Sequence, residues 1–342
     1  MIETRIRRNS PTLGEAEAAA AASAVLSNWA GRGPQTALFE REFCDLHGLD
    51  DGHAVAVSSG SAALYLALWA LEAGGKRVAI PAYACQPLAH AVRAVRAKPV
   101  TIDSRSDSDP NVDMQTLSAS GAELAIVPHS FGIPQVIGGQ RVAIIEDCAQ
   151  SLGAFAGGER VGLQGTIAVF SFGPTKIITA AGAGGMLLSK DIRCIEHIRD
   201  YLAYYDREDR KLRFNFEITD VHSAVGRVQL RRLPEFVARR EELFTSYLRS
   251  GAALLDATDP GVVPVRFGAV VLADRLAELE RGLAASGIPV RRGLAPQHLL
   301  GCASRDPNAH AFANRALLLP LYPSLSDVEA ALVTAALASA AP

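Results

Sequence analysis

A single lysine stands inside a long apolar segment. The run TIAVFSFGPTKIITAAGAGGMLLS, from Thr166 to Ser189, contains Lys176 as its only charged residue. Withdrawal from water lowers the pKa of an amine and makes it nucleophilic, as Schiff-base chemistry with a carbonyl compound requires. Ser171, on the same segment, offers a hydroxyl to a phosphate. The alternative is an ordinary lysine on a surface loop.

Two acids close another apolar run. Glu146 and Asp147 end the segment VAIIED at residues 142–147. A carboxylate at the end of a buried strand can hold a protonated heterocyclic nitrogen, because the negative charge raises the pKa of that nitrogen. The alternative is that these acids only cap the next helix or form a salt bridge.

A glycine follows a third apolar run. Gly60 comes directly after HAVAVSS at residues 53–59, and glycine allows a tight turn with close backbone approach. Ser61 is the expected cap of a helix at residues 61–73. The free N–H groups at such a helix start can bind a phosphate. An ordinary capped connection between a strand and a helix has the same pattern.

The elements that must position these residues alternate between strands and helices. Near-continuous apolar runs are typical of strands buried on both faces, and their alternation with helices predicts a mostly parallel sheet. The predicted strands lie at residues 53–59, 77–82, 98–103, 124–130, 142–147, 167–172 and 184–189. Ligands of such sheets bind beyond the carboxyl ends of the strands. A phosphate cradle, a carboxylate and an isolated lysine at that edge are what pyridoxal 5′-phosphate requires.

The pattern changes after Lys190. The following residues, 191–214, are charged and aromatic and predict a helix that ends in irregular structure. Residues 230–255 predict a long amphipathic helix that Pro234 kinks or restarts. A smaller α/β unit is expected beyond it, with a strand at 265–273 and a helix at 274–286 followed by Gly287. A long loop and a last helix with a capping box of Ser326 and Glu329 complete it.

Length and composition predict a protein of two domains. The chain has 342 residues, of which 49% are hydrophobic and 20% charged, with a formal net charge of −2. We therefore expect a sizeable core and no general nucleic-acid binding. The predicted boundary separates a large domain at residues 1–235, which includes an N-terminal helical segment, from a small domain at residues 236–342.

Cysteine and histidine usage gives no sign of a disulfide or a metal site. The five cysteines are scattered without a CxxC pair, and the eight histidines lack ligand spacing. No segment has the pattern of a signal peptide or the length of a membrane span. These observations predict a cytoplasmic protein without a metal.

Eight motifs in order resemble those of the DegT/DnrJ/EryC1/StrS family of sugar aminotransferases. They cover nearly the whole chain: SPTLGEAEAAAAASAVLSNWAGRGPQTALFEREF, VSSGSAALYLAL, IPAYACQPLAHAVRAVRAKPVTID, HSFG, IIEDCAQSLGA, FSFGPTK, NFEITDVHSAVGRVQLRRL and LLLPLYPSLSD. The resemblance implies an aspartate-aminotransferase-like α/β fold of type I, with a mostly parallel seven-stranded sheet and a smaller C-terminal α/β domain. It also implies pyridoxal 5′-phosphate as the cofactor.

The resemblance implies a role for each matching residue. Lys176 would bind the cofactor covalently and shuttle protons, and Asp147 would pair with the nitrogen of its ring. Gln150 would face the phenolic oxygen of the ring. His129 lies at a strand end near the site, where it would either support the structure or contact cofactor or substrate.

Phosphate binding is implied at four further positions. The backbone amides of Gly60 and Ser61 and the hydroxyl of Ser171 would hold the cofactor phosphate. Asn215 would reach the phosphate in the neighbouring subunit, which implies a homodimer with shared active sites.

The chain departs from the family pattern at several positions. Cys85 stands where the family has an aromatic residue stacked on the cofactor. Either Cys85 packs there, or Tyr83 takes over the stacking, or the stacking is lost. Ala183 replaces a frequent acid and Glu217 a frequent base, and the chain is short for the family.

The implied function is an aminotransferase that moves an amino group from L-glutamate or glutamine to a keto group. A nucleotide-linked deoxysugar is the expected acceptor, and Lys176 favours this reaction over that of related dehydratases, which have histidine there. The alternatives are a non-nucleotide ketone such as a keto-cyclitol, and a non-catalytic regulatory protein that binds the cofactor. Arg291, Arg292 and His298 are candidates for recognising an anionic substrate group, and a solvated basic loop is the alternative.

Overall fold

Seven strands form one central sheet, as the apolar runs predict. The computed structural model describes residues 6–205 and 207–340. Its large sheet has the strand order β1-β9-β8-β5-β4-β2-β3. The strands are β1 (Ala54–Val57), β2 (Arg77–Pro81), β3 (Lys98–Ile102), β4 (Leu124–Pro128), β5 (Ala143–Asp147), β8 (Ile167–Ser171) and β9 (Gly185–Leu188). Only β9 runs antiparallel to its neighbours in this sheet, so the other six strands end at one edge.

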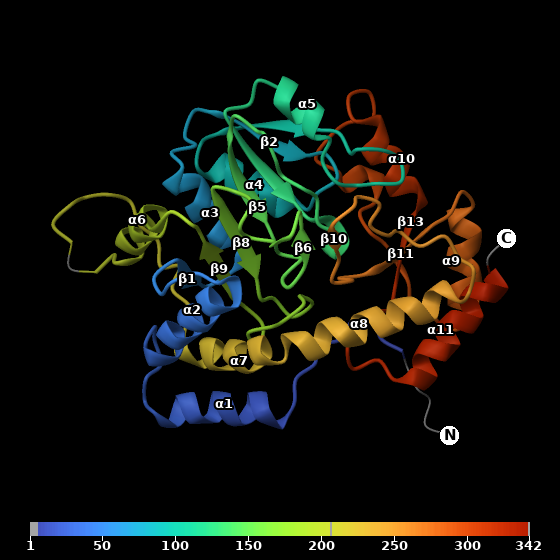
Figure 1. The fold of residues 1–342 in the computed structure, drawn as a ribbon, viewed down its shortest axis with the longest axis horizontal. Coiled ribbons are helices and arrows are strands. Elements are labelled where there is room, and N and C mark those ends of the chain that lie inside the picture. The colour runs from blue at the N-terminus through green and yellow to red at the C-terminus, as the bar shows by residue number, and fades with distance from the viewer. Residues whose placement is uncertain (1–5, 206, 341–342) are drawn as a thin grey trace.

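Helices cover both faces of this sheet (Figure 1). Side chains alternate along a strand, so Val55 and Val57 face one layer of helices, whereas Ala54 and Ala56 face the other. The first layer contains α3 (Gly60–Ala70), α4 (Gln86–Ala94) and α6 (Ile192–Leu202). The second contains α2 (Pro34–His47), α5 (Met114–Ala119) and α7 (Asp220–Arg231), and α1 (Glu15–Leu26) packs on α7.

The predicted restart at Pro234 is confirmed, but the helix ends at Leu248 and not at residue 255. The structure has α7, which ends at Arg231, and a separate helix α8 (Leu233–Leu248). Pro234 lies in the first turn of α8, where its missing N–H has no partner to lose, so the chain restarts there. Helix α8 runs from the large sheet to the C-terminal unit (Figure 1). The predicted domain boundary at residue 235 falls inside this helix and stays a prediction.

The C-terminal unit is built on an antiparallel sheet. Its strands are β11 (Ala269–Leu272), β13 (Ala316–Leu319) and β12 (Arg291–Arg292), with β13 in the middle. Helices α9 (Leu276–Ala285) and α11 (Asp327–Ala340) pack on this sheet with α8. Strand β11 is shorter than the predicted 265–273. Residues predicted as a long loop contain β12, the 3-10 turn η2 (Pro296–His298), α10 (Pro307–Arg315) and β13.

Local signals at two helix ends are confirmed. Gly287 follows α9 with φ +74°, a conformation that favours glycine. The backbone N–H of Glu329 donates to the Ser326 hydroxyl, while the Glu329 carboxylate accepts from the Ser326 N–H. These two bonds form the predicted capping box of α11. The remaining short elements are η1 (Ser130–Gly132) and a small sheet of β6 (Phe155–Ala156), β7 (Glu159–Arg160) and β10 (Val262–Val263).

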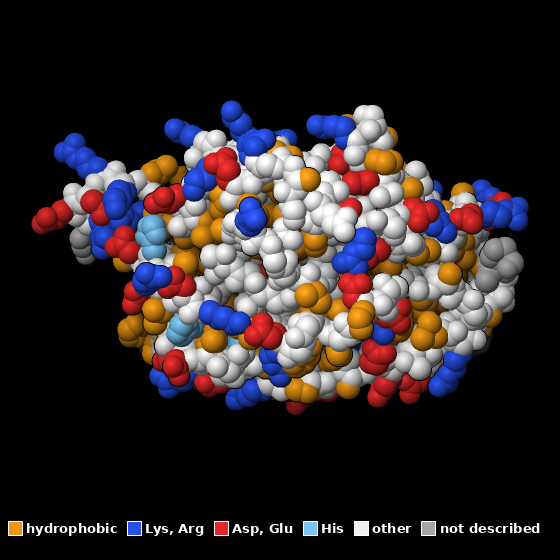
Figure 2. All heavy atoms as spheres, turned by 45° about the horizontal axis from the view of Figure 1, so that its top comes forward, with side chains coloured by type: hydrophobic (Ala, Val, Ile, Leu, Met, Phe, Trp, Pro, Cys, Tyr) orange, Lys and Arg blue, Asp and Glu red, His pale blue; other side chains and the backbone are white. Residues whose placement is uncertain are grey.

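The surface carries charges of both signs. On the face drawn in Figure 2, Lys and Arg side chains are interspersed with Asp and Glu. A face of this kind lacks the single-sign field that attracts a polyanion. In the described part of the chain, no helix has both the length and the apolar character that a membrane crossing needs.

Candidate active site

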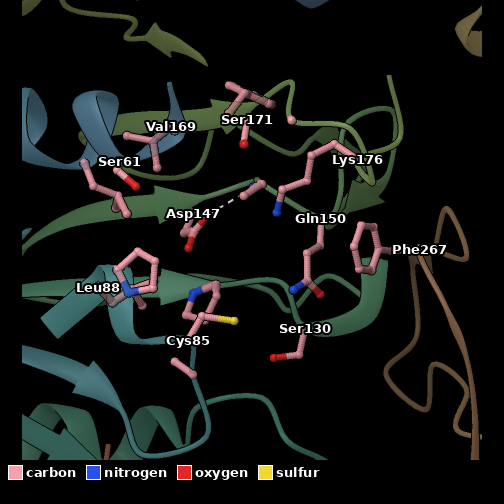
Figure 3. Close-up of a pocket in the computed structure, with 18 of the residues that line it drawn as sticks. Ser61, Cys85, Leu88, Ser130, Asp147, Gln150, Val169, Ser171, Lys176 and Phe267 are labelled. Atoms are coloured by element: carbon pink, nitrogen blue, oxygen red, sulfur yellow. Dashed lines mark hydrogen bonds between the residues drawn. The ribbon is translucent and has the colours of Figure 1, made fainter. Parts of the chain in front are cut away.

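A cavity of about 410 Å³ lies beyond the carboxyl ends of the large sheet, between that sheet and the C-terminal unit. Its walls come from segments that follow β1, β2, β4, β5 and β8, together with β12 and the chain before β11. Ten of the candidate site residues line it: Gly60, Ser61, Tyr83, Cys85, His129, Asp147, Gln150, Ser171, Lys176 and Arg291. Figure 3 shows the side chains of Asp147, Gln150, Ser171 and Lys176 around one space.

Lys176 lies on the loop after β8 and is partly buried in the cavity lining. Burial lowers the pKa of its amine, and the negative charge of nearby Asp147 opposes this shift. The amine lies 5.6 Å from the ring centroid of Phe267, within the range of a cation–π contact. Burial outweighs these two contacts, which favour the charged amine, so the pKa falls and the neutral, nucleophilic form becomes more accessible.

Asp147 is the last residue of β5 and is buried at the base of the cavity. The one hydrogen bond that its carboxylate makes within the described residues comes from the Ala149 N–H, at 3.0 Å. Burial raises the pKa of Asp147, and this hydrogen bond and the charge of Lys176 oppose the rise. A buried carboxylate with so few donors favours a cationic partner.

The side chain of Gln150 is oriented by a strained backbone. Its Oε1 accepts a 2.7 Å hydrogen bond from the N–H of Phe131. Phe131 has φ 56° and ψ 20°, a left-handed conformation that costs free energy for a residue with a side chain. Since Oε1 is occupied, the Gln150 amide presents its NH₂ group, a donor, to the cavity.

The cap of α3 is Ser59 and not the predicted Ser61. The Ser59 hydroxyl accepts from the Ala62 N–H at 3.1 Å, and Ser61 lies inside the first turn. The capping side chain belongs to the residue before the first helical position, which Gly60 occupies. The N–H groups of Gly60 and Ser61 start the helix and have no intrahelical acceptor, so they are available to an anion.

Gly60 is required by close packing on Ser171. A Cβ at position 60 would lie 2.7 Å from the Ser171 Cβ and 2.9 Å from its Oγ. The missing side chain therefore lets the start of α3 approach the end of β8. This approach brings two backbone donors and one hydroxyl to the same side of the cavity.

We expect Gly60→Ala to weaken binding of a phosphate group at this position by about 10-fold or more, because the added methyl group must displace Ser171. Gly138→Ala is the matched control, since a Cβ there meets no atom within 4 Å. Equilibrium titration with pyridoxal 5′-phosphate checks both variants. Equal affinities for both variants would contradict this account of the cradle.

Cys85 and Tyr83 differ in how they meet the cavity. Cys85 is exposed to it, and burial of its surroundings raises the pKa of the thiol. Tyr83 is held away from the open space: its hydroxyl accepts from the Leu294 N–H at 3.1 Å, and its ring packs edge-on against Phe312 at 4.9 Å. Burial raises the pKa of Tyr83 far above its ordinary value. Of the two, Cys85 has the freer side chain toward a ligand.

Three predicted site residues lie outside the lining of this cavity. Asn215 is exposed on the loop between α6 and α7, where its Oδ1 accepts from the Glu217 N–H at 3.0 Å. Arg292 is exposed and pairs with Glu280 at 3.5 Å. His298 is exposed in η2. Their assigned roles stay predictions.

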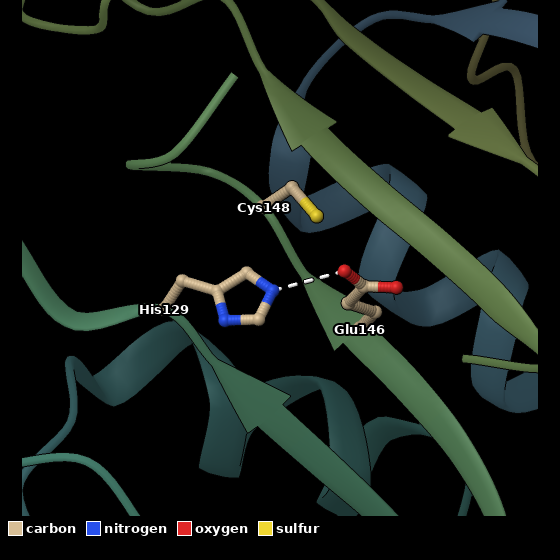
Figure 4. A group of neighbouring side chains, drawn as sticks. All are labelled: His129, Glu146 and Cys148. Carbon is tan, nitrogen blue, oxygen red and sulfur yellow. Dashed lines mark hydrogen bonds and ion pairs between the residues drawn. The ribbon is translucent and has the colours of Figure 1, made fainter. Parts of the chain in front are cut away.

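His129 belongs to a buried network with Glu146 (Figure 4). Its Nε2 donates to Glu146 Oε1 at 2.9 Å, while its Nδ1 accepts from the Gln135 N–H. The imidazole is therefore the neutral tautomer with its proton on Nε2. Although burial favours the protonated acid, hydrogen bonds hold the pKa of Glu146 below its ordinary value. The remaining donors are the N–H groups of Gly162, Gln164 and Gly165.

Cys148 completes a group in which one atom each of Cys148, His129 and Glu146 lie within 4.8 Å of one another. Ligation of a metal needs the lone pairs of these atoms. The Nε2 of His129 already donates a proton, and both Glu146 oxygens already accept hydrogen bonds. The arrangement is a structural clamp between β4 and β5 that holds the neighbouring Asp147 in place.

Sequence reasoning missed three residues of the site. The SSGS motif contains both Ser59 and Ser61, and the sequence alone does not show that Ser59 is the cap of α3. Phe131 lies in the HSFG motif, but its backbone strain has no sequence signal. Phe267 stands far from every motif and reaches Lys176 through the chain reversal before β11, where its N–H donates to the Phe131 carbonyl.

Comparisons with known proteins show which family the chain belongs to. The family model of the DegT/DnrJ/EryC1/StrS aminotransferase family matches residues 11–338. The chain is 31% identical over 364 residues to dTDP-4-dehydro-2,3,6-trideoxy-D-glucose 4-aminotransferase of Saccharopolyspora spinosa, covering 95% of this chain and 94% of that protein. It is 33% identical over 352 residues to dTDP-3-amino-3,4,6-trideoxy-alpha-D-glucose transaminase of Streptomyces venezuelae, covering 92% and 89%.

Solved structures share the fold. The aminotransferase TlmJ from Streptoalloteichus hindustanus has a TM-score of 0.89 and 29% identity, with 98% of each chain covered. A sugar aminotransferase, Spr1654 from Streptococcus pneumoniae, solved in a PLP-form, has a TM-score of 0.88 and 22% identity, covering 98% of each chain. The expected type I α/β fold is confirmed. The chain belongs to the DegT/DnrJ/EryC1/StrS aminotransferase family.

Proposed function

We propose that this aminotransferase uses pyridoxal 5′-phosphate to move an amino group from L-glutamate or glutamine to a keto group of a nucleotide-linked deoxysugar. One observation carries the proposal: Lys176, Asp147, Gln150 and Ser171 line a single cavity at the carboxyl edge of the sheet. Each comes from a different position in the sequence, and each supplies a different interaction that this cofactor needs.

The residues present fit the cofactor. Asp147 is a buried carboxylate without a cationic partner within hydrogen-bond distance among the described residues. The protonated ring nitrogen of the cofactor would be such a partner. Gln150 offers an N–H donor for the phenolic oxygen. The N–H groups of Gly60 and Ser61 and the hydroxyl of Ser171 form a cradle for the phosphate.

When bound, the cofactor supplies an aldehyde that takes up the amino group and a ring that accepts the electrons released at the substrate carbon. Lys176 would hold the cofactor through its amine, and the same amine would move a proton at the substrate carbon. Asp147 keeps a proton on the ring nitrogen. Gln150 would donate to the phenolic oxygen, and Cys85 has a side chain that is free to contact the bound cofactor.

The acceptor is proposed from the two curated relatives, whose names both describe dTDP-linked deoxysugars. The test is competition in the acceptor half-reaction. Thymidine diphosphate should inhibit reaction with a dTDP-linked keto-deoxysugar and should leave the donor half-reaction much less affected. If thymidine diphosphate has no effect while a non-nucleotide ketone such as a keto-cyclitol is aminated, the acceptor proposal is wrong.

We also propose a homodimer with shared active sites. Asn215 lies on a loop that carries exposed apolar side chains, Tyr205, Leu212 and Phe214, which favour contact with a second copy of the chain. In such a dimer Asn215 would contact the phosphate of the neighbouring subunit.

Sedimentation is expected to give twice the chain mass of 36.2 kDa. Asn215→Ala should weaken cofactor binding by about 10-fold, because one hydrogen bond to a charged group is lost. The mass measured by sedimentation should not change. If the protein is a monomer, or if Asn215→Ala binds the cofactor as tightly as the wild type, the proposal of shared active sites is wrong. We also propose a cytoplasmic location, because the five cysteines are scattered along the sequence without a CxxC pair.

A further inference from the structure

We propose that Arg291 binds the α-carboxylate of the amino donor. This inference rests on the proposed function and selects one residue from the basic segment VRRGLAPQH. It assigns Arg291 to the α-carboxylate of the amino donor, and the names of the relatives do not give this assignment.

Strand geometry separates the two neighbouring arginines of β12. Arg291 and Arg292 pair with Leu318 and Leu317 of β13. Successive side chains of a strand point to opposite faces. Arg292 accordingly pairs with Glu280 of α9, whereas Arg291 lines the cavity.

Arg291 is an exposed residue of the cavity lining. Within residues 6–205 and 207–340, no acid lies within ion-pair distance of Arg291, and its side chain makes no hydrogen bond. The other cationic side chain of the cavity lining is Lys176, which the cofactor occupies in the proposed function. A carboxylate that enters the cavity can therefore accept two parallel hydrogen bonds from the planar guanidinium of Arg291.

The position suits the α-carboxylate. The donor's amino nitrogen must reach the place where Lys176 holds the aldehyde, and its α-carboxyl carbon lies only about 2.5 Å from that nitrogen. Lys176, Cys85 and Arg291 all line this cavity. Burial raises the pKa of the Cys85 thiol, and the charges of Lys176 and Arg291 oppose this rise, whereas the charge of Asp147 adds to it. The phosphates of a nucleotide-linked sugar are separated from the keto carbon by the sugar ring and would lie farther from Lys176.

The backbone that carries Arg291 is fixed. A Cβ at Gly293 would collide with the Tyr83 hydroxyl, so glycine allows this segment to pack directly on Tyr83. The Leu294 N–H donates to the same hydroxyl at 3.1 Å. The end of β12 is therefore held against the large domain, which keeps the Arg291 stem at the cavity wall.

The test compares Arg291→Gln with the matched control Arg292→Gln in the donor half-reaction of the cofactor-loaded enzyme. L-Glutamate, L-glutamine and 1-aminobutane serve as donors, and the absorbance of the bound cofactor is followed. We expect the half-saturating concentration of both amino acids to rise about 10- to 100-fold in Arg291→Gln, as for the loss of a charge-assisted hydrogen-bond pair. Arg291→Lys should recover part of the loss, and Arg292→Gln should match the wild type.

The carboxylate-free amine provides the internal control. Its rate should be equal in the wild type and in Arg291→Gln, and the starting absorbance of both should agree, which shows an intact cofactor site. Wild-type half-saturation in Arg291→Gln would overturn the inference, as would a loss confined to glutamate or to the acceptor half-reaction. If the wild type itself fails to react with any amino acid, the proposed function fails instead.

Discussion

Lys176→Ala is expected to reduce transamination by about 10⁴-fold or more. The substitution removes both the amine that holds the cofactor and the base that moves the proton, and either loss alone costs orders of magnitude. The absorbance band that pyridoxal 5′-phosphate gains on covalent attachment to the protein should also disappear. Steady-state rates and an absorbance spectrum measure the two effects separately.

Lys190→Ala is the control for this experiment. Lys190 is about half-exposed and pairs with Glu159 at 3.2 Å on the surface, so its removal should change the rate less than about twofold. Turnover in Lys176→Ala close to that of the wild type would refute the catalytic assignment. Loss of turnover with an unchanged absorbance band would refute the covalent role alone.

Asp147→Asn is expected to lower turnover by about 10³-fold while leaving the fold intact. The amide oxygen of asparagine can still accept the 3.0 Å hydrogen bond from the Ala149 N–H. It carries no charge, however, and cannot hold a proton on a heterocyclic nitrogen, so the electron-accepting power of the cofactor falls. Because the phosphate cradle is untouched, cofactor affinity should fall much less than the rate.

The matched control is Asp113→Asn. Asp113 caps α5 through hydrogen bonds to the N–H groups of Gln115 and Thr116, and asparagine caps helices equally well. Its rate and melting temperature should equal those of the wild type. If Asp147→Asn keeps more than about a tenth of the wild-type rate, Asp147 does not have the role assigned to it.

The large sheet was predictable because most of its strands are buried on both faces, although the edge strand β3 is only partly buried. Each of the seven apolar runs became a strand, since a run such as AVAV at β1 has no polar face to expose. The C-terminal unit was less predictable. Strand β12 consists of two arginines, and its pairing with β13 comes from tertiary structure alone.

Some residues of the candidate site were also predictable from the sequence, and others were not. Lys176, Asp147 and Gln150 stand in motifs at strand ends, so their meeting at one edge follows from parallel strand direction. The difference between Arg291 and Arg292 could not be predicted, because strand register decides which side chain faces the cavity. The contact of Phe267 with Lys176 depends on a loop without periodicity.

The donor half-reaction tests the central claim most directly. Purified protein loaded with pyridoxal 5′-phosphate is mixed with excess L-glutamate, and the absorbance of the bound cofactor is recorded together with the 2-oxoglutarate formed. The account predicts loss of the starting band and one equivalent of 2-oxoglutarate per site, with the band restored when a dTDP-linked keto-deoxysugar is added. A protein that binds the cofactor but shows no spectral change with glutamate or glutamine would contradict it.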